Sequence, residues 1–396
     1  MADTLTLRER FNFAQRVFFG VAAVAALAAA FGFVQNRAVF FESWLLGFLF
    51  WLALPLGSLA LVMLHHITGG SWGFAIRRLL EASMRTLPVL ALFFVPIALG
   101  MHELYAWSHA DVVAADPALQ QKSSYLQPQF FLIRAALYFA IWAGLAWRLN
   151  GLAARNDQLG SEKLKRKMRI VSGPGIALYG FSLTFAAVDW AMSLEPHWFS
   201  TIYGVMFIVG QVLATLAFSI ATSAWLSRRE PFTRWMKADY YHDLGKLMFA
   251  FVLLWAYVAY SQYLIIWSAN LSEETPWYLH RATGGWERIA LFLIVFHFAL
   301  PFCALLSRKT KRNSKLLAAI AVFLLALRFV DLYWLVIPAF HPGELHFHWL
   351  YVATPVAMGG VWLGVFVQQL KGRPLISLQD AKLETLLEGA SAPSQH

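Results

Sequence analysis

Long apolar runs separated by short polar breaks follow one another along most of the 396-residue chain. Each run is about 20 residues long, which is the length that an α-helix needs to cross the ~30 Å hydrocarbon core of a bilayer. We therefore expect an all-α integral membrane protein with about ten transmembrane helices. The predicted helices run from Ala14 to Val34, Ser43 to Leu64, Leu87 to Trp107, Gln129 to Trp147, Ile170 to Trp190, Ile202 to Leu226, Leu244 to Trp267, Ile289 to Leu306, Leu316 to Ile337 and Trp349 to Leu370.

The composition agrees with a membrane protein and excludes a soluble one. Hydrophobic residues make up 59% of the chain and charged residues only 14%, whereas about 25% of the residues of a soluble domain are charged. So little charge cannot cover the surface of a soluble fold. The one cysteine, Cys303, lies within an apolar run, so the chain has neither a disulfide framework nor the cysteines that an iron–sulfur cluster needs.

The basic residues indicate how the chain is oriented. The formal net charge is +10, but Lys and Arg lie mostly between the apolar runs and form no nucleic-acid-binding motif. Of the 32 Lys and Arg residues, most lie on the side of the amino terminus, and the few in loops on the opposite side are Arg37, Lys122, Arg281 and Arg288. By the positive-inside rule, both ends of the chain are cytoplasmic.

Two segments allow more than one interpretation. The first apolar run follows Arg8 and Arg10, so it could also be the core of a cleaved signal peptide, although it is long for one. The segment Gly69 to Thr86 mixes aromatic and aliphatic residues with arginines, as a helix in the membrane interface does. A plain cytoplasmic loop is the alternative for this second segment.

The inner helices divide into two sets of four, the second to fifth and the sixth to ninth. In both sets a basic, aromatic cytoplasmic segment follows the first helix, at Gly69 to Arg85 and at Arg228 to Lys246, which is a weak sign of duplication. The predicted organisation is a first helix within residues 1–40, four-helix bundles at 41–190 and 191–338, a last helix at 339–373 and a polar cytoplasmic tail at 374–396.

Several ionisable residues fall within the predicted helices. Each costs at least about 2.5 to 3.5 kcal/mol at mid-bilayer, so each is a functional candidate. At about 1.5 Å of rise per residue they lie at overlapping depths toward the outer half of the membrane. Together they could hold a quinone headgroup or relay protons; for the pair on the ninth helix the alternative is a structural ion pair between packed helices. The candidates are His102, Glu103, Arg134, Asp189, His297, Arg328 and Asp331.

A second polar group is predicted where the second helix ends and the seventh begins. It would form the cytoplasmic mouth of a proton path, or it consists of ordinary solvated helix ends. Its members are His65, His66, Asp243 and Lys246. Polar side chains farther along the seventh helix could carry protons outward, or could hold helices together by hydrogen bonds. These are Tyr257, Tyr260, Ser261, Gln262 and Tyr263.

The histidines are placed poorly for haem and match a metal site only by composition. No predicted helix holds two well-separated histidines, which a b-type haem held between helices would need. One outer loop groups four potential metal ligands, but their spacing matches no metal motif, and an ordinary wet loop is the favoured interpretation. These four are His341, Glu344, His346 and His348. We expect this chain to bind neither a metal nor a redox cofactor of its own.

Four segments together resemble a known family. They are His65 to Gly73 (HHITGGSWG), Asp189 to Thr201 (DWAMSLEPHWFST), His242 to Lys246 (HDLGK) and Tyr260 to Tyr263 (YSQY). In combination, and from about the first helix to the tenth, the chain resembles the smaller of the two polysulfide-reductase-like (NrfD-type) membrane subunits of bacterial alternative complex III.

The resemblance implies a subunit of a quinol:electron-acceptor oxidoreductase in the bacterial cytoplasmic membrane. It also implies two four-helix bundles with one further helix at each end of the chain. Electrons would pass from quinol to a periplasmic iron–sulfur protein and to multihaem and monohaem c-type cytochromes. The other implied partners are a larger homologous membrane subunit and small membrane or lipoprotein subunits, with a terminal oxidase as a further candidate.

The role of this subunit within such a complex has alternatives. No quinone motif can be matched here residue by residue, and the larger sister subunit is the better candidate for the quinol site. Proton conduction is therefore the preferred role, and direct quinol oxidation the alternative. A secondary transporter or a purely structural membrane anchor would use the same buried charges differently. A transporter would have broken helices at matching places in two repeats, but Pro55, Pro88 and Pro96 do not interrupt matching places.

Overall fold

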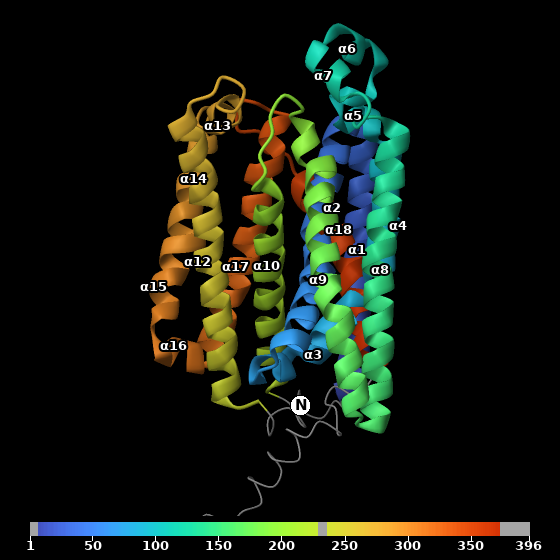
Figure 1. Cartoon of the computed structure of the whole chain (residues 1–396), viewed down its shortest axis with the longest axis vertical. Helices are drawn as coiled ribbons and strands as arrows, with labels where there is room; N and C mark the ends of the chain where they lie inside the picture. Colours follow the sequence, from blue (N-terminus) through green and yellow to red (C-terminus); the bar gives the residue numbers. More distant parts are fainter. Residues whose placement is uncertain (1–6, 229–235, 373–396) are drawn as a thin grey trace, which may run out of the picture.

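A computed structural model describes residues 7–228 and 236–372, and within these ranges the chain forms only helices and the segments that connect them (Figure 1). The prediction of an all-α fold is confirmed. The predicted polar tail at 374–396 lies outside the described residues.

The long helices of the first half are α1 (Leu7–Gln35), α2 (Arg37–Thr68), α8 (Pro128–Leu159) and α9 (Glu162–Trp190), and between them lie α3 (Ser71–Met84) and α4 (Leu87–Leu99). The second half contains α10 (Tyr203–Leu226), α12 (Ala238–Ala269), α14 (Trp286–Phe292), the π-helical segment η3 (Leu293–Ala299), α15 (Leu300–Leu306), α17 (Ser314–Val336) and α18 (Leu350–Lys371). Short helices in the loops are α5 (Met101–Leu104), α6 (Ala110–Ala115), α7 (Pro117–Lys122), α13 (Pro276–Arg281) and α16 (Arg308–Arg312).

The number of membrane-spanning helices agrees with the sequence pattern. In residues 7–228 and 236–372, nine helices are long and apolar enough to cross a membrane, or ten if α3 and α4, which meet at 44°, cross as one broken span. The predicted third helix, Leu87 to Trp107, is wrong at its outer end. Helix α4 stops at Leu99, because Gly100 interrupts the helix and the polar residues beyond it face water.

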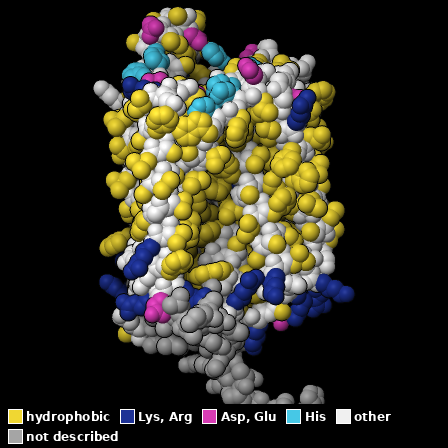
Figure 2. All heavy atoms as spheres, turned by 180° about the vertical axis from the view of Figure 1, so that it is seen from behind, with side chains coloured by type: hydrophobic (Ala, Val, Ile, Leu, Met, Phe, Trp, Pro, Cys, Tyr) yellow, Lys and Arg dark blue, Asp and Glu magenta, His cyan; other side chains and the backbone are white. Residues whose placement is uncertain are grey.

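The two ends of the molecule differ in charge. In Figure 2, Lys and Arg gather at one end, and Asp, Glu and His gather at the other. Helices α1 and α18 run antiparallel, and Lys371 Nζ donates a hydrogen bond to Asn12 Oδ1 (2.7 Å) at the basic end. The start of α1 and the end of α18 thus lie together at the end that the positive-inside rule makes cytoplasmic. We call the opposite end the outer end.

The inner helices form two groups that lie side by side (Figure 1). Helices α2, α4, α8 and α9 pack together, and so do α10, α12, α17 and the continuous α14–η3–α15 helix. Helices α2 and α10 are the most buried and meet between the groups. Gly57 lies so close to α10 that a Cβ would come within 2.4 Å of the Gln211 carbonyl oxygen, and Thr215 Oγ1 donates to the Leu54 carbonyl oxygen (3.1 Å). We call this contact the α2–α10 seam.

Helix α1 packs along α18 through two glycines. A Cβ at Gly360 would lie 2.6 Å from the Phe18 carbonyl oxygen, and one at Gly364 would lie 2.5 Å from the Phe19 ring. Small residues four positions apart let membrane helices approach backbone to backbone. The first predicted helix is therefore packed as an integral part of the bundle.

The segment predicted to lie in the membrane interface forms the helix α3, but this helix is more buried than an interfacial one. Ile76 and Leu80 are 0% and 1% exposed, and α3 contacts α2, α10, α12 and α18. Its charges are held by an ion network in which Arg78 pairs with Glu81 (2.7 Å) and with Asp157 of α8 (2.6 Å). Helix α3 therefore joins the two groups at the basic end.

Candidate functional site

In the first group, a fully buried carboxylate lies near the outer end. Asp189 is the next-to-last residue of α9 and is 0% exposed. Arg134 of α8 donates to both of its oxygens, from Nε to Oδ2 (2.8 Å) and from Nη2 to Oδ1 (2.9 Å), which is the strong bidentate geometry. Tyr138 also donates to Oδ2 (2.8 Å). Since Arg134 and Tyr138 lie four residues apart on one face of α8, both reach the same carboxylate.

The Arg134 guanidinium is enclosed by aromatic rings on its other side. Its Cζ lies 3.8 Å from the centroid of the Tyr125 ring and 4.4 Å from that of Phe130, and Nη1 donates to the Tyr125 carbonyl oxygen (2.9 Å). Such cation–π contacts stabilise a charge that has lost its water. We call Arg134, Tyr138 and Asp189 the Asp189 site.

The second group contains a similar site deeper in the bundle. Arg328 and Asp331, 1% and 2% exposed, form an ion pair within α17, and Trp255 of α12 donates from Nε1 to Asp331 Oδ2 (3.1 Å). The guanidinium lies against Gly210 of α10, where a Cβ would be 2.2 Å from Arg328 Cζ. The ion pair considered from the sequence is thus present, but it lies within one helix rather than between two.

His297 lies beside this pair, fully buried, and neither ring nitrogen has a hydrogen-bond partner among the described residues. Its ring centroid is 4.2 Å from that of Trp255. The residue belongs to the π-helical segment η3, and π-helical turns are frequent at functional sites. A buried polar group without a partner costs about 1–3 kcal/mol, so packing alone does not explain it. We call Trp255, His297, Arg328 and Asp331 the Asp331 site.

The two sites share a plan. Each combines a buried Arg–Asp pair with an aromatic side chain that donates to the carboxylate, Tyr138 in one and Trp255 in the other. The two aspartates lie on the last helix of their groups, α9 and α17. The arginines differ in position, since one lies on the neighbouring helix and the other on the same helix as the aspartate. The matching aspartates strengthen the sign of duplication in the sequence.

Buried polar side chains continue from the Asp189 site toward the basic end along one face of α9. The residues are Ser172, Tyr179 and Ser182, all at most 5% exposed. Their contacts are Trp142 Nε1 to Ser182 Oγ (2.9 Å), Tyr179 OH to Gln211 Oε1 (3.1 Å) and His66 Nδ1 with Ser172 Oγ (3.1 Å). We call these three residues and Asp189 the α9 stripe.

The α9 stripe extends through much of the membrane. Its members are seven, three and seven positions apart, so they share one helix face, and at about 1.5 Å per residue they extend over about 26 Å. Sequence reasoning found only the end at Asp189 and the neighbouring His66. Ser and Tyr are common in membrane helices, and the signal that could have revealed them is their helical spacing.

The predicted cytoplasmic mouth is divided between the two groups. His66 ends α2 and bonds to Ser172 of the α9 stripe, while His65 Nε2 lies 3.1 Å from a backbone carbonyl oxygen of the following turn. Asp243 and Lys246 pair with each other on α12, in the second group (3.3 Å). His66 therefore leads into the buried polar contacts of the α9 stripe.

The tyrosines predicted to carry protons along the seventh helix face outward. Tyr257, Tyr260 and Tyr263 are 67%, 61% and 41% exposed. The inward face of α12 carries Trp255 and Gln262. The tyrosines lie on other faces of the same helix. Gln262 is 1% exposed and accepts a hydrogen bond from a serine hydroxyl at 3.4 Å. Tyr257 and Tyr260 therefore lie on the exposed surface of the described chain, whereas Gln262 lies inside the group.

His102 and Glu103 also lie outside the buried sites. They belong to α5, in the cap of short helices that projects at the outer end (top of Figure 1). Glu103 pairs with the 60% exposed Arg37 (3.1 Å), and the His102 ring is 5.0 Å from that of His109. The seven ionisable residues placed at overlapping depth therefore do not meet in one place. Five of them form the Asp189 site and the Asp331 site, and the other two, His102 and Glu103, lie in the outer cap.

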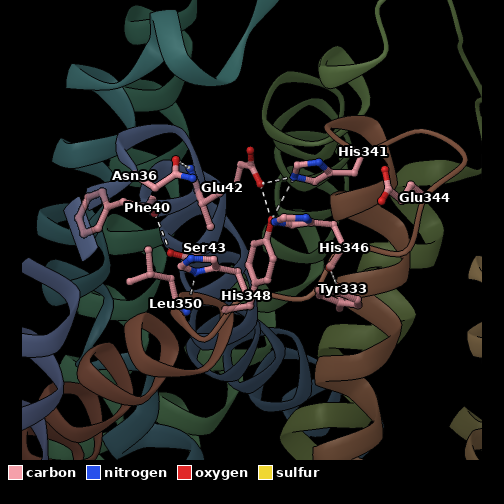
Figure 3. A network of polar contacts seen from close by, with 12 residues as sticks. Asn36, Phe40, Glu42, Ser43, Tyr333, His341, Glu344, His346, His348 and Leu350 are labelled. Carbon is pink, nitrogen blue, oxygen red and sulfur yellow. Dashed lines mark hydrogen bonds and ion pairs between the residues drawn. The ribbon is translucent and has the colours of Figure 1, made fainter. Parts of the chain in front are cut away.

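Sequence reasoning missed a buried carboxylate at the outer end. Glu42 lies in the second turn of α2 and is 5% exposed. Tyr351 of α18 donates to Glu42 Oε2 (2.5 Å), and His341 Nε2 lies 3.1 Å from the same oxygen (Figure 3). The predicted start of this helix, Ser43, leaves Glu42 just outside it. The helix begins six residues earlier, so the carboxylate falls within the bundle.

The loop that holds His341 brings three imidazole rings together (Figure 3). The His341 and His346 rings stack with centroids 4.0 Å apart, and the His346 and His348 rings are 6.4 Å apart and nearly parallel. Burial lowers the pKa of His346 below its usual range, and the neighbouring His341 adds to this. Two imidazolium charges 4 Å apart repel by about 4 kcal/mol at an effective dielectric constant near 20. The stacked pair therefore favours a single proton.

The histidine loop does not have the geometry of a metal site. Across residues 7–228 and 236–372, no three His, Cys, Asp or Glu side chains are placed to hold a metal ion. The loop is nevertheless more than a wet connection, because its histidines meet a buried carboxylate.

A separate ion pair closes the outer end of the second group. Glu195, which lies in one of the segments that carry the family resemblance, binds Arg281 Nη2 (2.8 Å) and His280 Nδ1 (3.1 Å). Arg281 is 2% exposed and also donates to the Leu335 carbonyl oxygen (2.9 Å) at the end of α17. These contacts hold the loop around α13 against α17, so Glu195 has a structural role.

The fold and the sites define an all-α, multi-pass membrane protein with one buried Arg–Asp pair in each of two helix groups. A scan against protein-family models finds no match to the chain, and a search of the curated proteins finds none either. Membership of the alternative complex III family is therefore a proposal that depends on the four segments named above.

Proposed function

We propose that this chain is a proton-conducting membrane subunit of an electron-transfer complex of the alternative complex III type, in the bacterial cytoplasmic membrane. The observation that carries the proposal is the α9 stripe, which extends from Ser172, bonded to His66 near the basic end, to Asp189 near the outer end. Two of the four family-like segments begin at the two ends of this stripe, at His65 and at Asp189.

The chemistry of the stripe suits protons. Hydroxyl groups and imidazoles can donate and accept hydrogen bonds in turn. Steps of seven, three and seven residues separate Ser172, Tyr179, Ser182 and Asp189 by about 10, 4.5 and 10 Å along α9, so water molecules between these side chains would carry the proton from one to the next. At the outer end, a proton that reaches Tyr138 meets a carboxylate held by Arg134. Its transfer to Asp189 requires this ion pair to open, so a conformational step accompanies the last transfer.

The electron-transfer partners follow from the resemblance. Quinol oxidation, iron–sulfur clusters and c-type haems are assigned to the larger membrane subunit and to the periplasmic subunits. In this proposal the present chain supplies the proton path, and electron transfer in its neighbours drives the opening of the Asp189 site.

The existence of the complex is tested by gentle detergent extraction from the native membrane, followed by native gel electrophoresis and haem staining. We expect the chain to migrate with haem-containing subunits. Migration as a lone, haem-free species would contradict the proposal.

The proton path is tested by a matched pair of Tyr→Phe variants of the complex in liposomes. Tyr179→Phe removes the hydroxyl from the middle of the α9 stripe, whereas Tyr257→Phe removes one from the exposed face of α12. We expect Tyr179→Phe to lower proton movement per electron several-fold and Tyr257→Phe to leave it unchanged. Equal proton movement in both variants, with assembly intact, would remove the stripe from the path. Asp189→Asn and Asp331→Asn test the two ion pairs in the same assay.

A second candidate function is direct binding of a quinone at the Asp331 site. The observation in its favour is His297, whose ring nitrogens lack partners beside the flat face of Trp255. Quinone carbonyl oxygens accept hydrogen bonds and quinone rings stack on aromatic side chains, so both groups suit a headgroup. A short-chain quinone bound at this site should quench the fluorescence of Trp255 in the unmodified chain. In His297→Phe the same quinone should quench it less. Equal quenching in the two proteins would contradict binding at this site.

The alternatives of a transporter and a plain anchor are less favoured. The bend between α3 and α4 has no counterpart in α12, the corresponding helix of the second group, which is continuous from Ala238 to Ala269. A purely structural anchor would gain nothing from His297, whose buried ring nitrogens have no hydrogen-bond partner among the described residues.

A further inference from the structure

The column of histidines at the outer end is not explained by the proton path in the first group. It consists of His341, His346 and His348 in the loop before α18 (Figure 3). The inner end of the column meets Glu42, which is 5% exposed, and its other end lies among exposed residues of the loop. A row of titratable rings thus connects a buried carboxylate with the outer solution.

The inner end of the column is a shared proton site by its geometry. Glu42 Oε2, His341 Nε2 and Tyr351 OH lie within hydrogen-bond distance of one another, at 3.1 Å, 2.5 Å and 3.4 Å. An anionic carboxylate favours the protonated imidazole beside it. The stacked His346 ring, 4.0 Å away, opposes a second positive charge. The group therefore favours one proton at a time.

The surroundings hold the rings in place. Tyr333 of α17 donates to the His346 carbonyl oxygen, and Trp286 Nε1 donates to the carbonyl oxygens of His341 (3.3 Å) and Glu344 (3.0 Å). These bonds hold the backbone of the loop, so the loop cannot shift freely to move the rings apart. The charged and titratable groups that face the pair are Glu42 from α2, Tyr333 from α17, Tyr351 from α18, and Glu344 and His348 from the loop itself.

We propose that Glu42, His341 and His346 form a proton-exchange site that takes up one proton within the outer end and passes it to the outer solution through His348. The protons balance: His341 gives up a proton to a water molecule, His346 or His348 takes one up from water, and Glu42 is left to attract the next; water is needed because the stacked rings present their faces, not their N–H groups, to one another. The place of this site at the exit of a transmembrane path rests on the function proposed above; the coupled binding of one proton does not.

Other outer histidines provide the matched control. His197 pairs with Asp116 at 2.6 Å, but its side chain is 64% exposed. In this pair the Asp116 carboxylate is partly exposed, and within the described residues no second imidazole stacks on His197. A variant at His197 removes a histidine–carboxylate pair of the same chemistry without the buried carboxylate or the stack.

The experiment uses the full chain in lipid nanodiscs and follows the imidazole nitrogen NMR signals as pH changes. Glu42→Gln should lower the pH at which His346 takes up its proton by about one unit, a ten-fold loss of proton affinity, because the carboxylate that attracts the proton is removed. His341→Asn should raise it, because the stacked ring that opposes a second positive charge is removed, and His197→Asn should leave it unchanged. If Glu42→Gln does not fold, His341→Asn decides. An unchanged His346 titration in the variant measured overturns the proposal.

A second measurement separates this inference from the proposed function. The assembled complex is reconstituted in liposomes and proton release at the outer face is timed. Slower release in Glu42→Gln supports the exit site, and unchanged release overturns its place on the path. If the unmodified complex moves no protons, the proposed function fails. The coupled binding of one proton at the outer end is then decided by the NMR titration of the isolated chain alone.

Discussion

Asp189 has no exposure, and Arg134 and Tyr138 supply all three of its side-chain hydrogen bonds. Asp189→Asn removes the negative charge and leaves the guanidinium, which is 7% exposed, without its counter-charge. Breaking a buried pair by loss of one partner costs about 3–5 kcal/mol. We expect a loss of this size in the free energy of unfolding, measured in detergent by chemical denaturation.

The control for that variant is an exposed pair on the same helix. Glu162 pairs with Lys165 at 2.7 Å, with side chains 84% and 38% exposed. Exposed pairs of this spacing contribute about 0.3–0.5 kcal/mol, so Glu162→Gln should change stability little. Similar losses in the two variants would show that the Asp189 pair is not shielded from solvent.

For His297 we predict no loss of stability when the polar side chain is replaced. Its ring nitrogens have no partner in the described residues, so His297→Phe replaces an unsatisfied polar ring by an apolar one of similar shape. We expect thermal unfolding to occur at the same temperature or slightly higher, because a desolvation cost of about 1–3 kcal/mol is removed. Trp255→Phe should instead destabilise the chain, because it leaves Asp331 without the donor at 3.1 Å. Strong destabilisation by His297→Phe would show that the imidazole has a structural partner.

At this scale the sequence predicted the charged residues better than their partners. Counting depth along the helices found Arg134, Asp189, Arg328 and Asp331, because a charge in an apolar run stands out. It did not find Tyr138 or Trp255, since these aromatic side chains are common in membrane helices. It also missed Glu42, because the predicted start of the second helix at Ser43, six residues after the start at Arg37, left Glu42 just outside.

Rotation of a helix about its axis decides which polar side chains face inward. In α12, Trp255 and Gln262 face inward while Tyr257 and Tyr260 are exposed. In a soluble helix the polar face marks the water side. In this helix both faces are apolar, one toward lipid and the other toward protein, so hydropathy could not show that Tyr257 and Tyr260 lie on the exposed face.

The contact of α1 with α18 gives a prediction for a whole element. A Cβ at Gly360 would lie within 2.8 Å of backbone atoms of Phe18 and Ala22, and backbone cannot move aside locally. Gly360→Val should therefore separate the two helices and cost about 1–3 kcal/mol. Limited proteolysis should detect the change as faster cleavage around α1.

Gly20, also on α1, is the matched control, because no atom lies within 4 Å of a Cβ built there. Gly20→Ala should preserve the contact and stabilise the helix by roughly 0.5–1 kcal/mol. If Gly360→Val were as resistant to protease as Gly20→Ala, the close approach of α1 and α18 would not exist in the membrane.

For the molecule as a whole, the number of helices, the two groups of four and the charge difference between the ends followed from sequence. Apolar length fixes the helix count, and Lys and Arg fix the basic end. The contacts between helices did not follow, because they depend on packing. Whether the buried charges meet in one place was open from sequence for this reason, and packing divides them between an Asp189 site and an Asp331 site.

The outer end should respond to acid. The pKa of His346 is lowered in the folded chain, so between this value and about 6.5, the usual value of an unfolded histidine, the unfolded state binds more protons. Stability must then rise with pH in that window and fall on acidification. We expect the protection factors of the amides in residues 341–349, which correct for the intrinsic pH dependence of exchange, to fall as the pH falls below about 6.5.

His346→Gln supplies the control for this measurement, because glutamine keeps a polar side chain but does not titrate. In this variant the exchange of residues 341–349 should depend less on pH over the same range, apart from the intrinsic effect on amide exchange. An equal pH response in both proteins would assign it to another group.

The α2–α10 seam limits how the molecule can move. Carriers that rock one half of the protein past the other need an interface between the halves that can slide. Here Gly57 admits the α10 backbone so closely that no methyl group would fit, and Thr215 bonds across the contact. The two groups therefore act as one rigid frame. If protons cross through such a frame, as proposed above, they must pass between side chains and water without a movement of one group of helices past the other.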